Sequence, residues 1–132
     1  MVLTPTYHVF EMYKPYMDAT VLPVELKSPW YNKDQWVMPA VSASAVRDKA
    51  GVVRVALANL DPNRPHTVSA TLQGVAATGV SGRVLTAPAI NSLNSFDAPD
   101  TVAPAPFQGA RIEGGALTVT LPPKSVVMLD LR

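Results

Sequence analysis

The chain has 132 residues, a length typical of one domain, with 48% hydrophobic residues, 16% charged residues and a formal net charge of +1. Acidic and basic residues are interspersed, so we expect no basic surface for a nucleic-acid backbone. No segment has the roughly 20 consecutive apolar residues of a membrane helix. The absence of cysteine excludes a disulfide framework and a thiolate nucleophile. No secretory signal follows Met1, and we expect a cytoplasmic protein without a cofactor.

Residues 4–17 are predicted to form the only helix. Thr4 can cap its first turn, and Pro5 suits the first helical position. Pro15 is expected to end or kink it. Apolar side chains recur at steps of three and four residues and share one face, which consists of Tyr7, Phe10, Tyr13 and Met17. Because such a face needs a partner surface, we predict that it contacts another domain or another subunit.

After Asp18 the apolar spacing changes to two, which indicates strands. The predicted strands cover residues 20–26, 37–45, 52–60, 67–73, 82–86, 117–121 and 125–131. Pro23 should make the first of them an edge strand or an irregular one. Two irregular segments are expected between strands: a polar, turn-like tip at 28–35 and a long loop at 87–111. We expect Phe96, Val102 and Phe107 to hold that loop in place.

About seven or eight short strands separated by turns are typical of an antiparallel sandwich or jelly roll. The sequence therefore predicts an all-β fold, an antiparallel β-sandwich of jelly-roll type preceded by one N-terminal α-helix. The domain boundary is placed near Asp18, with a terminal helix at 1–18 and the sandwich at 19–132.

Residue types that perform catalysis do not form a recognisable pattern. A glycosidase needs two carboxylates about 5–5.5 Å or 6.5–9.5 Å apart, but most acidic residues here fall in turns or at strand ends. Asp97 and Asp100, in the long loop, are the closest pair, and we interpret them as loop-pinning groups. His8 and His66 are the only histidines, without a metal-ligand spacing. We therefore predict no catalytic and no metal-binding residue, which leaves a small stand-alone enzyme as the weakest hypothesis.

Three aromatic residues surround the predicted tip: Trp30, Tyr31 and Trp36. Exposed flat rings on a sandwich loop can stack on the apolar faces of sugars. Trp and Tyr are also enriched at protein interfaces, so packing against a neighbouring domain or subunit is the other interpretation. These residues are the candidate carbohydrate-binding site of the chain.

Several sequence motifs, spread in order over nearly the whole chain, carry a family resemblance. They lie at residues 3–10 (LTPTYHVF), 39–48, 55–63 (VALANLDPN), 82–107 and 121–127 (LPPKSVV). The run at 85–107, LTAPAINSLNSFDAPDTVAPAPF, is the most informative of them. On these motifs the chain resembles the C-terminal part of glycoside hydrolase family 51 α-L-arabinofuranosidases.

The resemblance implies a jelly-roll-like sandwich that packs on the catalytic (β/α)8 barrel of a parent enzyme, meaning a longer chain of which this is one part. Such an enzyme releases terminal α-L-arabinofuranosyl residues from hemicellulose. Its two catalytic glutamates belong to the barrel, and no residue here matches either motif, so the chain is expected to be inactive alone. Residues 1–18 would be the last barrel helix.

The function implied by the resemblance is structural, in the assembly of an arabinofuranosidase. The expected partners are the barrel of the same enzyme or neighbouring subunits. Without a partner for its helix, the chain should self-associate, fold the helix back on the sandwich or fray at residues 1–17. The alternative is a carbohydrate-binding module that holds an arabinose-containing polysaccharide through Trp30, Tyr31 and Trp36.

Overall fold

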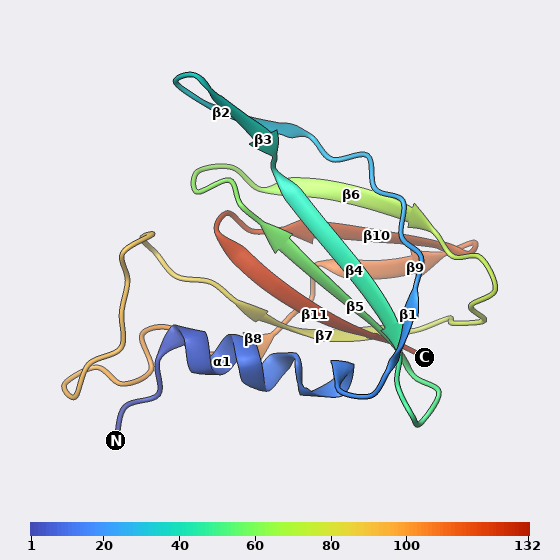
Figure 1. Ribbon diagram of the computed structural model, residues 1–132, viewed down its shortest axis with the longest axis horizontal. Helices are drawn as coiled ribbons and strands as arrows, with labels where there is room; N and C mark the ends of the chain where they lie inside the picture. The colour runs from blue at the N-terminus through green and yellow to red at the C-terminus, as the bar shows by residue number, and fades with distance from the viewer.

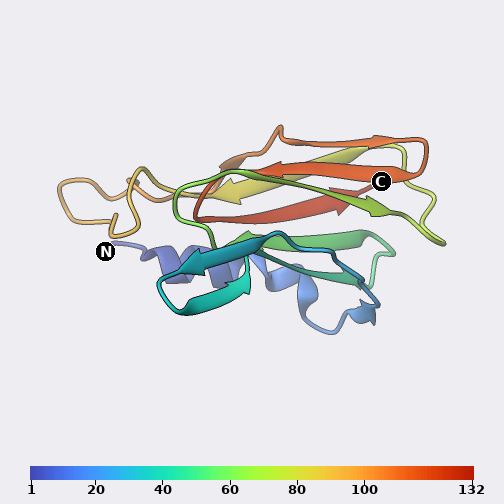
Figure 2. The same cartoon turned by 90° about the horizontal axis from the view of Figure 1, so that it is seen from above.

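In the computed structural model, which describes residues 1–132, two antiparallel sheets lie face to face, and a helix lies against the larger one (Figures 1 and 2). The helix α1 (Pro5–Met12) is followed by a single 3₁₀ turn, η1 (Lys14–Tyr16). The strands are β1 (Thr20–Leu22), β2 (Trp30–Lys33), β3 (Trp36–Pro39), β4 (Val41–Arg47), β5 (Val53–Asn59), β6 (His66–Thr71), β7 (Val80–Leu85), β8 (Ala105–Pro106), β9 (Ala110–Glu113), β10 (Ala116–Leu121) and β11 (Ser125–Leu131).

The larger sheet has six strands in the order β1-β4-β5-β11-β7-β8, and the smaller has three in the order β6-β10-β9. The hairpin β2-β3 forms a separate two-stranded sheet. Every strand pair is antiparallel. The predicted all-β sandwich with one N-terminal helix is confirmed. No helix in this structure has both the length and the apolar character needed to cross a membrane.

The core lies between the two sheets, and alternation along the strands builds it. In β10, Leu117, Val119 and Leu121 are buried, while Thr118 and Thr120 point away from the core. The strand β11 instead has apolar residues on both faces. Val127 and Leu129 face the other sheet, and Met128 faces the helix. Covering both faces explains why the sequence of β11 is almost continuously hydrophobic.

The helix begins as predicted and ends earlier than predicted. Oγ1 of Thr4 accepts a hydrogen bond from the backbone N–H of Tyr7 at 3.1 Å, and Pro5 occupies the first turn. The α-helix ends at Met12, because Pro15 lacks an N–H and its ring would collide with the carbonyl of Glu11. The predicted span through residue 17 was therefore wrong, whereas the predicted break of the helix at Pro15 is confirmed.

The helix is docked on the outer face of the six-stranded sheet, with Met12 fully buried in a second apolar cluster. The cluster contains Met12, Ala56, Leu85, Val102 and Met128, and Val9, Tyr13 and Tyr16 pack against it. Arg83 of β7 adds a two-pronged ion pair, because its two terminal nitrogens lie 3.0 and 3.3 Å from the carboxylate oxygens of Glu11. Of the three expected states of the helix, the structure has the one folded back on the sandwich.

Tyr16 fastens the 3₁₀ turn to the sheet. Its hydroxyl donates to the carbonyl of Ser44 at 2.9 Å and accepts from the backbone N–H of Ala56 at 3.0 Å. We expect Tyr16→Phe to lower the free energy of unfolding by about 1 kcal/mol, the net value of a hydrogen bond in a protein. Urea unfolding of the chain measures this. Tyr7→Phe is the matched control, because the Tyr7 side chain is exposed; equal losses in both variants would contradict the anchoring role.

Two segments that were expected to be irregular contain strands. Residues 28–35 are not a polar tip, since β2 and β3 pair there around the two-residue turn Asp34–Gln35. Residues 87–111 contain β8 and the start of β9. Val102 and Phe107 are buried as expected, whereas Phe96 is 85% exposed and holds nothing in place.

Candidate functional site

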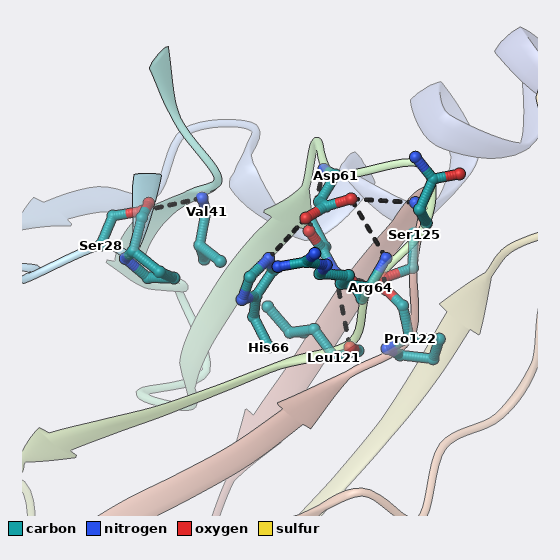
Figure 3. A network of polar contacts seen from close by, with 11 residues as sticks. Ser28, Val41, Asp61, Arg64, His66, Leu121, Pro122 and Ser125 are labelled. Carbon is teal, nitrogen blue, oxygen red and sulfur yellow. Dashed lines mark hydrogen bonds and ion pairs between the residues drawn. The ribbon is translucent and has the colours of Figure 1, made fainter. Parts of the chain in front are cut away.

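A buried polar network lies where the β5–β6 turn meets the β10–β11 turn (Figure 3). Oδ1 of Asp61 accepts hydrogen bonds from the backbone N–H of Asn63 at 2.9 Å and of Arg64 at 3.1 Å. Oδ2 of Asp61 lies 2.9 Å from Nε2 of His66. Burial by itself raises the pKa of Asp61, but the hydrogen bonds from Asn63, His66 and Arg64 outweigh it, so the pKa lies below the usual 3.8.

Asn59, which is 2% exposed, connects this carboxylate to the other turn. Its Nδ2 donates to the carbonyls of Arg64 at 3.0 Å and Pro122 at 2.9 Å, and its Oδ1 accepts from the backbone N–H of Asp61 at 3.0 Å. The hydroxyl of Ser125 donates to the same Pro122 carbonyl at 2.7 Å. An ionised carboxylate with both oxygens engaged suits a structural role better than proton transfer.

The acid limb of the stability curve tests the Asp61 network. Because the folded-state pKa is lowered, the stabilisation is present above the unfolded pKa near 3.8 and is lost as the pH falls through the folded value. In that range we expect the free energy of unfolding of Asp61→Asn to depend less steeply on pH. The slope should fall by up to the amount that one bound proton contributes. Urea titrations at several pH values measure this slope. Asp18→Asn is the control, because that carboxylate is 74% exposed; an unchanged slope in Asp61→Asn would contradict the prediction.

The other acidic groups do not form a carboxylate pair in a cleft. Asp48 and Asp130 both bind Arg54, the first at 3.0 Å. Among the surface hollows, one of about 180 Å³ has no acidic residue and one of about 190 Å³ has only Asp130. Asp97 and Asp100 are exposed in the long loop. The described residues hold no group of three or more His, Cys, Asp or Glu side chains suited to a metal ion.

The predicted helix face is divided in the structure. Tyr7 and Phe10 are exposed, Phe10 to 75%, and Met17 is exposed beyond the end of the 3₁₀ turn. Tyr13 instead packs against the sheet, with its ring centroid 5.1 Å from that of Tyr16. That this face contacts another domain or subunit stays a prediction. Three of the four residues of the face are exposed and could make such a contact.

The candidate carbohydrate site lies on the hairpin β2-β3, which projects beyond the sheets in Figure 1. Trp30 and Trp36 are 65% and 68% exposed, and Tyr31 packs against the core. Trp36 pairs with Lys33 and Tyr31 with Met38, so Tyr31 and Trp36 share one face of the hairpin. Trp30 pairs with Pro39 and therefore lies on the other face. The three rings do not form one flat platform.

A third group of exposed apolar residues was not anticipated from the sequence. It lies in the long loop and consists of Ile90, Leu93 and Phe96. The three residues stand three apart among Asn, Ser, Asp and Pro. Because they lie in no helix or strand, this spacing alone did not separate outward from inward side chains.

Fold and surfaces together define an antiparallel β-sandwich domain with a docked helix and apolar residues exposed on its helix, hairpin and long loop. Residues 1–125 match the family model described as the α-L-arabinofuranosidase C-terminal domain. The chain belongs to this family.

Two relatives support the assignment over the full length of the chain. An intracellular exo-α-L-arabinofuranosidase of Bacteroides ovatus is 41% identical over 133 residues, which cover 100% of this chain and 26% of the relative. The crystal structure of the GH51 arabinofuranosidase from Xanthomonas axonopodis pv. citri superposes with a TM-score of 0.98 at 50% identity, covering 100% of this chain and 27% of that one.

A more distant structure shares the fold. The GH51 α-L-arabinofuranosidase from Thermotoga petrophila has a TM-score of 0.80 at 18% identity, covering 99% of this chain and 29% of its own. The chain thus spans between a quarter and a third of the length of these proteins.

Proposed function

We propose that the chain is the structural C-terminal domain of a parent α-L-arabinofuranosidase, and that it completes and stabilises the catalytic (β/α)8 barrel without contributing a catalytic residue. The observation that carries this proposal is the match of the whole chain to 27% of a GH51 enzyme at 50% identity. The parent enzyme would hydrolyse terminal α-L-arabinofuranosyl residues of hemicellulose. The name of the B. ovatus relative supports a cytoplasmic location.

The mechanism of such a domain is the burial of apolar surface against the rest of the enzyme. Fully burying one large apolar side chain is worth roughly 1.5–3 kcal/mol. Tyr7, Phe10 and Met17 are exposed in this chain and support a contact with the barrel or a neighbouring subunit. Ion-paired and hydrogen-bonded carboxylates, such as Asp61 and Asp130, support a role without acid–base chemistry.

Hydrolysis of 4-nitrophenyl α-L-arabinofuranoside tests the proposal. We compare the intact parent enzyme, the parent enzyme ending before this domain, and this chain alone. We expect activity from the intact enzyme, none from the chain, and an unstable or inactive shortened enzyme that recovers when the chain is added. Hydrolysis by the chain alone would overturn the proposal, and Asp97 and Asp100 would be the first residues to change.

Carbohydrate binding is the second candidate, supported by the two-thirds exposure of Trp30 and Trp36 on a projecting hairpin. It predicts that arabinoxylan or arabinan retards the chain in an affinity gel and that Trp30→Ala removes the retardation. The opposite faces of the two rings imply that one of them dominates. Trp36→Ala is therefore measured beside Trp30→Ala, and no retardation by any arabinose polymer would exclude this candidate.

A further inference from the structure

The long loop between β7 and β8 combines exposed apolar side chains with internally bound polar groups. Ile90, Leu93 and Phe96 are 79%, 63% and 85% exposed, and we call these three residues the loop surface. Single exposed apolar residues are common on proteins. Three of them within seven residues concentrate exposed apolar area on one loop, and concentrated apolar area marks contact surfaces.

Hydrogen bonds fix the backbone that presents the loop surface. Asn94 binds across the loop, since its Oδ1 accepts from the backbone N–H of Val102 at 2.7 Å and its Nδ2 donates to the carbonyl of Val102 at 2.8 Å. The hydroxyls of Ser92 and Ser95 accept from the backbone N–H groups of Ala89 and Ala98. Less backbone entropy therefore remains to be lost on binding, which favours a preorganised contact.

The loop lies beside the start of the domain. Nδ2 of Asn94 also donates to the carbonyl of Leu3 at 2.8 Å. In Figures 1 and 2 the loop extends past the N-terminal end of α1, next to the first residues. The family is a C-terminal domain, and the chain matches only 26% and 27% of two relatives, so most of such an enzyme precedes this domain. The preceding polypeptide therefore reaches the domain next to the loop surface, at high effective concentration.

The charges of the loop also restrict its partner. Asp97 and Asp100 are exposed next to the loop surface, and residues 86–104 contain no basic side chain. Interfaces commonly have an apolar centre and a polar rim. The complementary surface would thus be an apolar depression bordered by Lys or Arg.

We propose that the loop surface docks into an apolar depression on the catalytic portion of the same polypeptide, the portion that precedes this domain. The inference rests on the proposed function and adds the contact through which the domain is positioned. Phe96 is the central residue of the contact, because it is the largest and most exposed of the three.

Hydroxyl-radical footprinting tests the contact on this chain and on the intact parent enzyme. We expect the labelling rate of Phe96 to fall severalfold in the intact enzyme, because its 85% exposed ring would be buried, with the exposed Val21 of β1 as the internal reference. Intramolecular docking predicts the same protection at every enzyme concentration. Protection that disappears on dilution would assign the surface to a second copy and overturn the proposal.

The same experiment separates this inference from the proposed function. Protection of Phe10 or Trp36 with full labelling of Phe96 would overturn the loop contact and leave the domain role intact. Full labelling of all three would refute both.

Thermal unfolding is a second measurement. Phe96→Asp should lower the thermal midpoint of the intact enzyme by several degrees and leave the midpoint of the chain alone unchanged. Trp36→Asp, on the hairpin, is the matched control. Equal midpoints for the Phe96→Asp and unaltered enzymes would also overturn the inference.

Discussion

Met12→Ala is expected to lower the free energy of unfolding of the chain by about 2–5 kcal/mol, the usual cost of truncating a fully buried methionine. Met12 has no exposed surface and fills the space between α1 and the six-stranded sheet. Its loss leaves a cavity over Met128 that α1 cannot close, because Arg83 and Tyr16 hold the helix and its following turn in place. Urea unfolding followed by circular dichroism measures the change.

Phe10→Ala is the matched control on the same helix. Phe10 is 75% exposed, so its truncation should change the free energy of unfolding by no more than about 0.5 kcal/mol. In the intact parent enzyme, the proposed contact with the barrel or a neighbouring subunit would bury Phe10. There Phe10→Ala should lower the stability more than it does in the chain alone. A larger loss for Phe10→Ala than for Met12→Ala in the chain would mean that α1 docks through its other face.

Asn59→Ala is expected to lower the free energy of unfolding by about 3 kcal/mol, since the variant removes the hydrogen bonds of a buried amide and leaves the buried backbone N–H of Asp61 unpaired. The backbone N–H of Asp61 and the carbonyl of Arg64 lose the hydrogen bonds from Asn59, and the carbonyl of Pro122 keeps only the bond from the Ser125 hydroxyl. The thermal unfolding midpoint should fall with it. Asn63→Ala is the control, because the Asn63 side chain is exposed. A midpoint shift no greater than that of Asn63→Ala would mean that the network does not stabilise the fold.

The sequence predicts those strands that bury at least one face in the core. β5 and β10 have alternating patterns and were found almost to the residue. Of the hairpin, β2 was missed and β3 was predicted as part of one strand with β4, because nearly all residues of the hairpin are exposed on both faces. Without a buried face, no period of two is required of the sequence.

The helix shows why the candidate contact residues were placed only in part. Spacings of three and four residues fit two stripes on α1, one through Tyr7 and Phe10 and one through His8 and Met12. Because its aromatic residues are larger, the first stripe was predicted to be the face that packs against a partner surface. The sheet takes the second stripe, because the slimmer Met12 fits between Ala56 and Met128. The three residues of the loop surface also stand three apart, but they lie in no helix or strand, so only their exposure in the folded chain reveals the surface.

The position of β11 has a consequence for biosynthesis. It is the last strand in the sequence, yet it lies in the middle of the six-stranded sheet, where it pairs with β5 on one side and β7 on the other. Before β11 emerges from the ribosome, β1-β4-β5 and β7-β8 are separate fragments with unpaired edges. Until the seven-residue strand β11 is available, the strand edges that it pairs with in the folded domain are therefore open to wrong pairing.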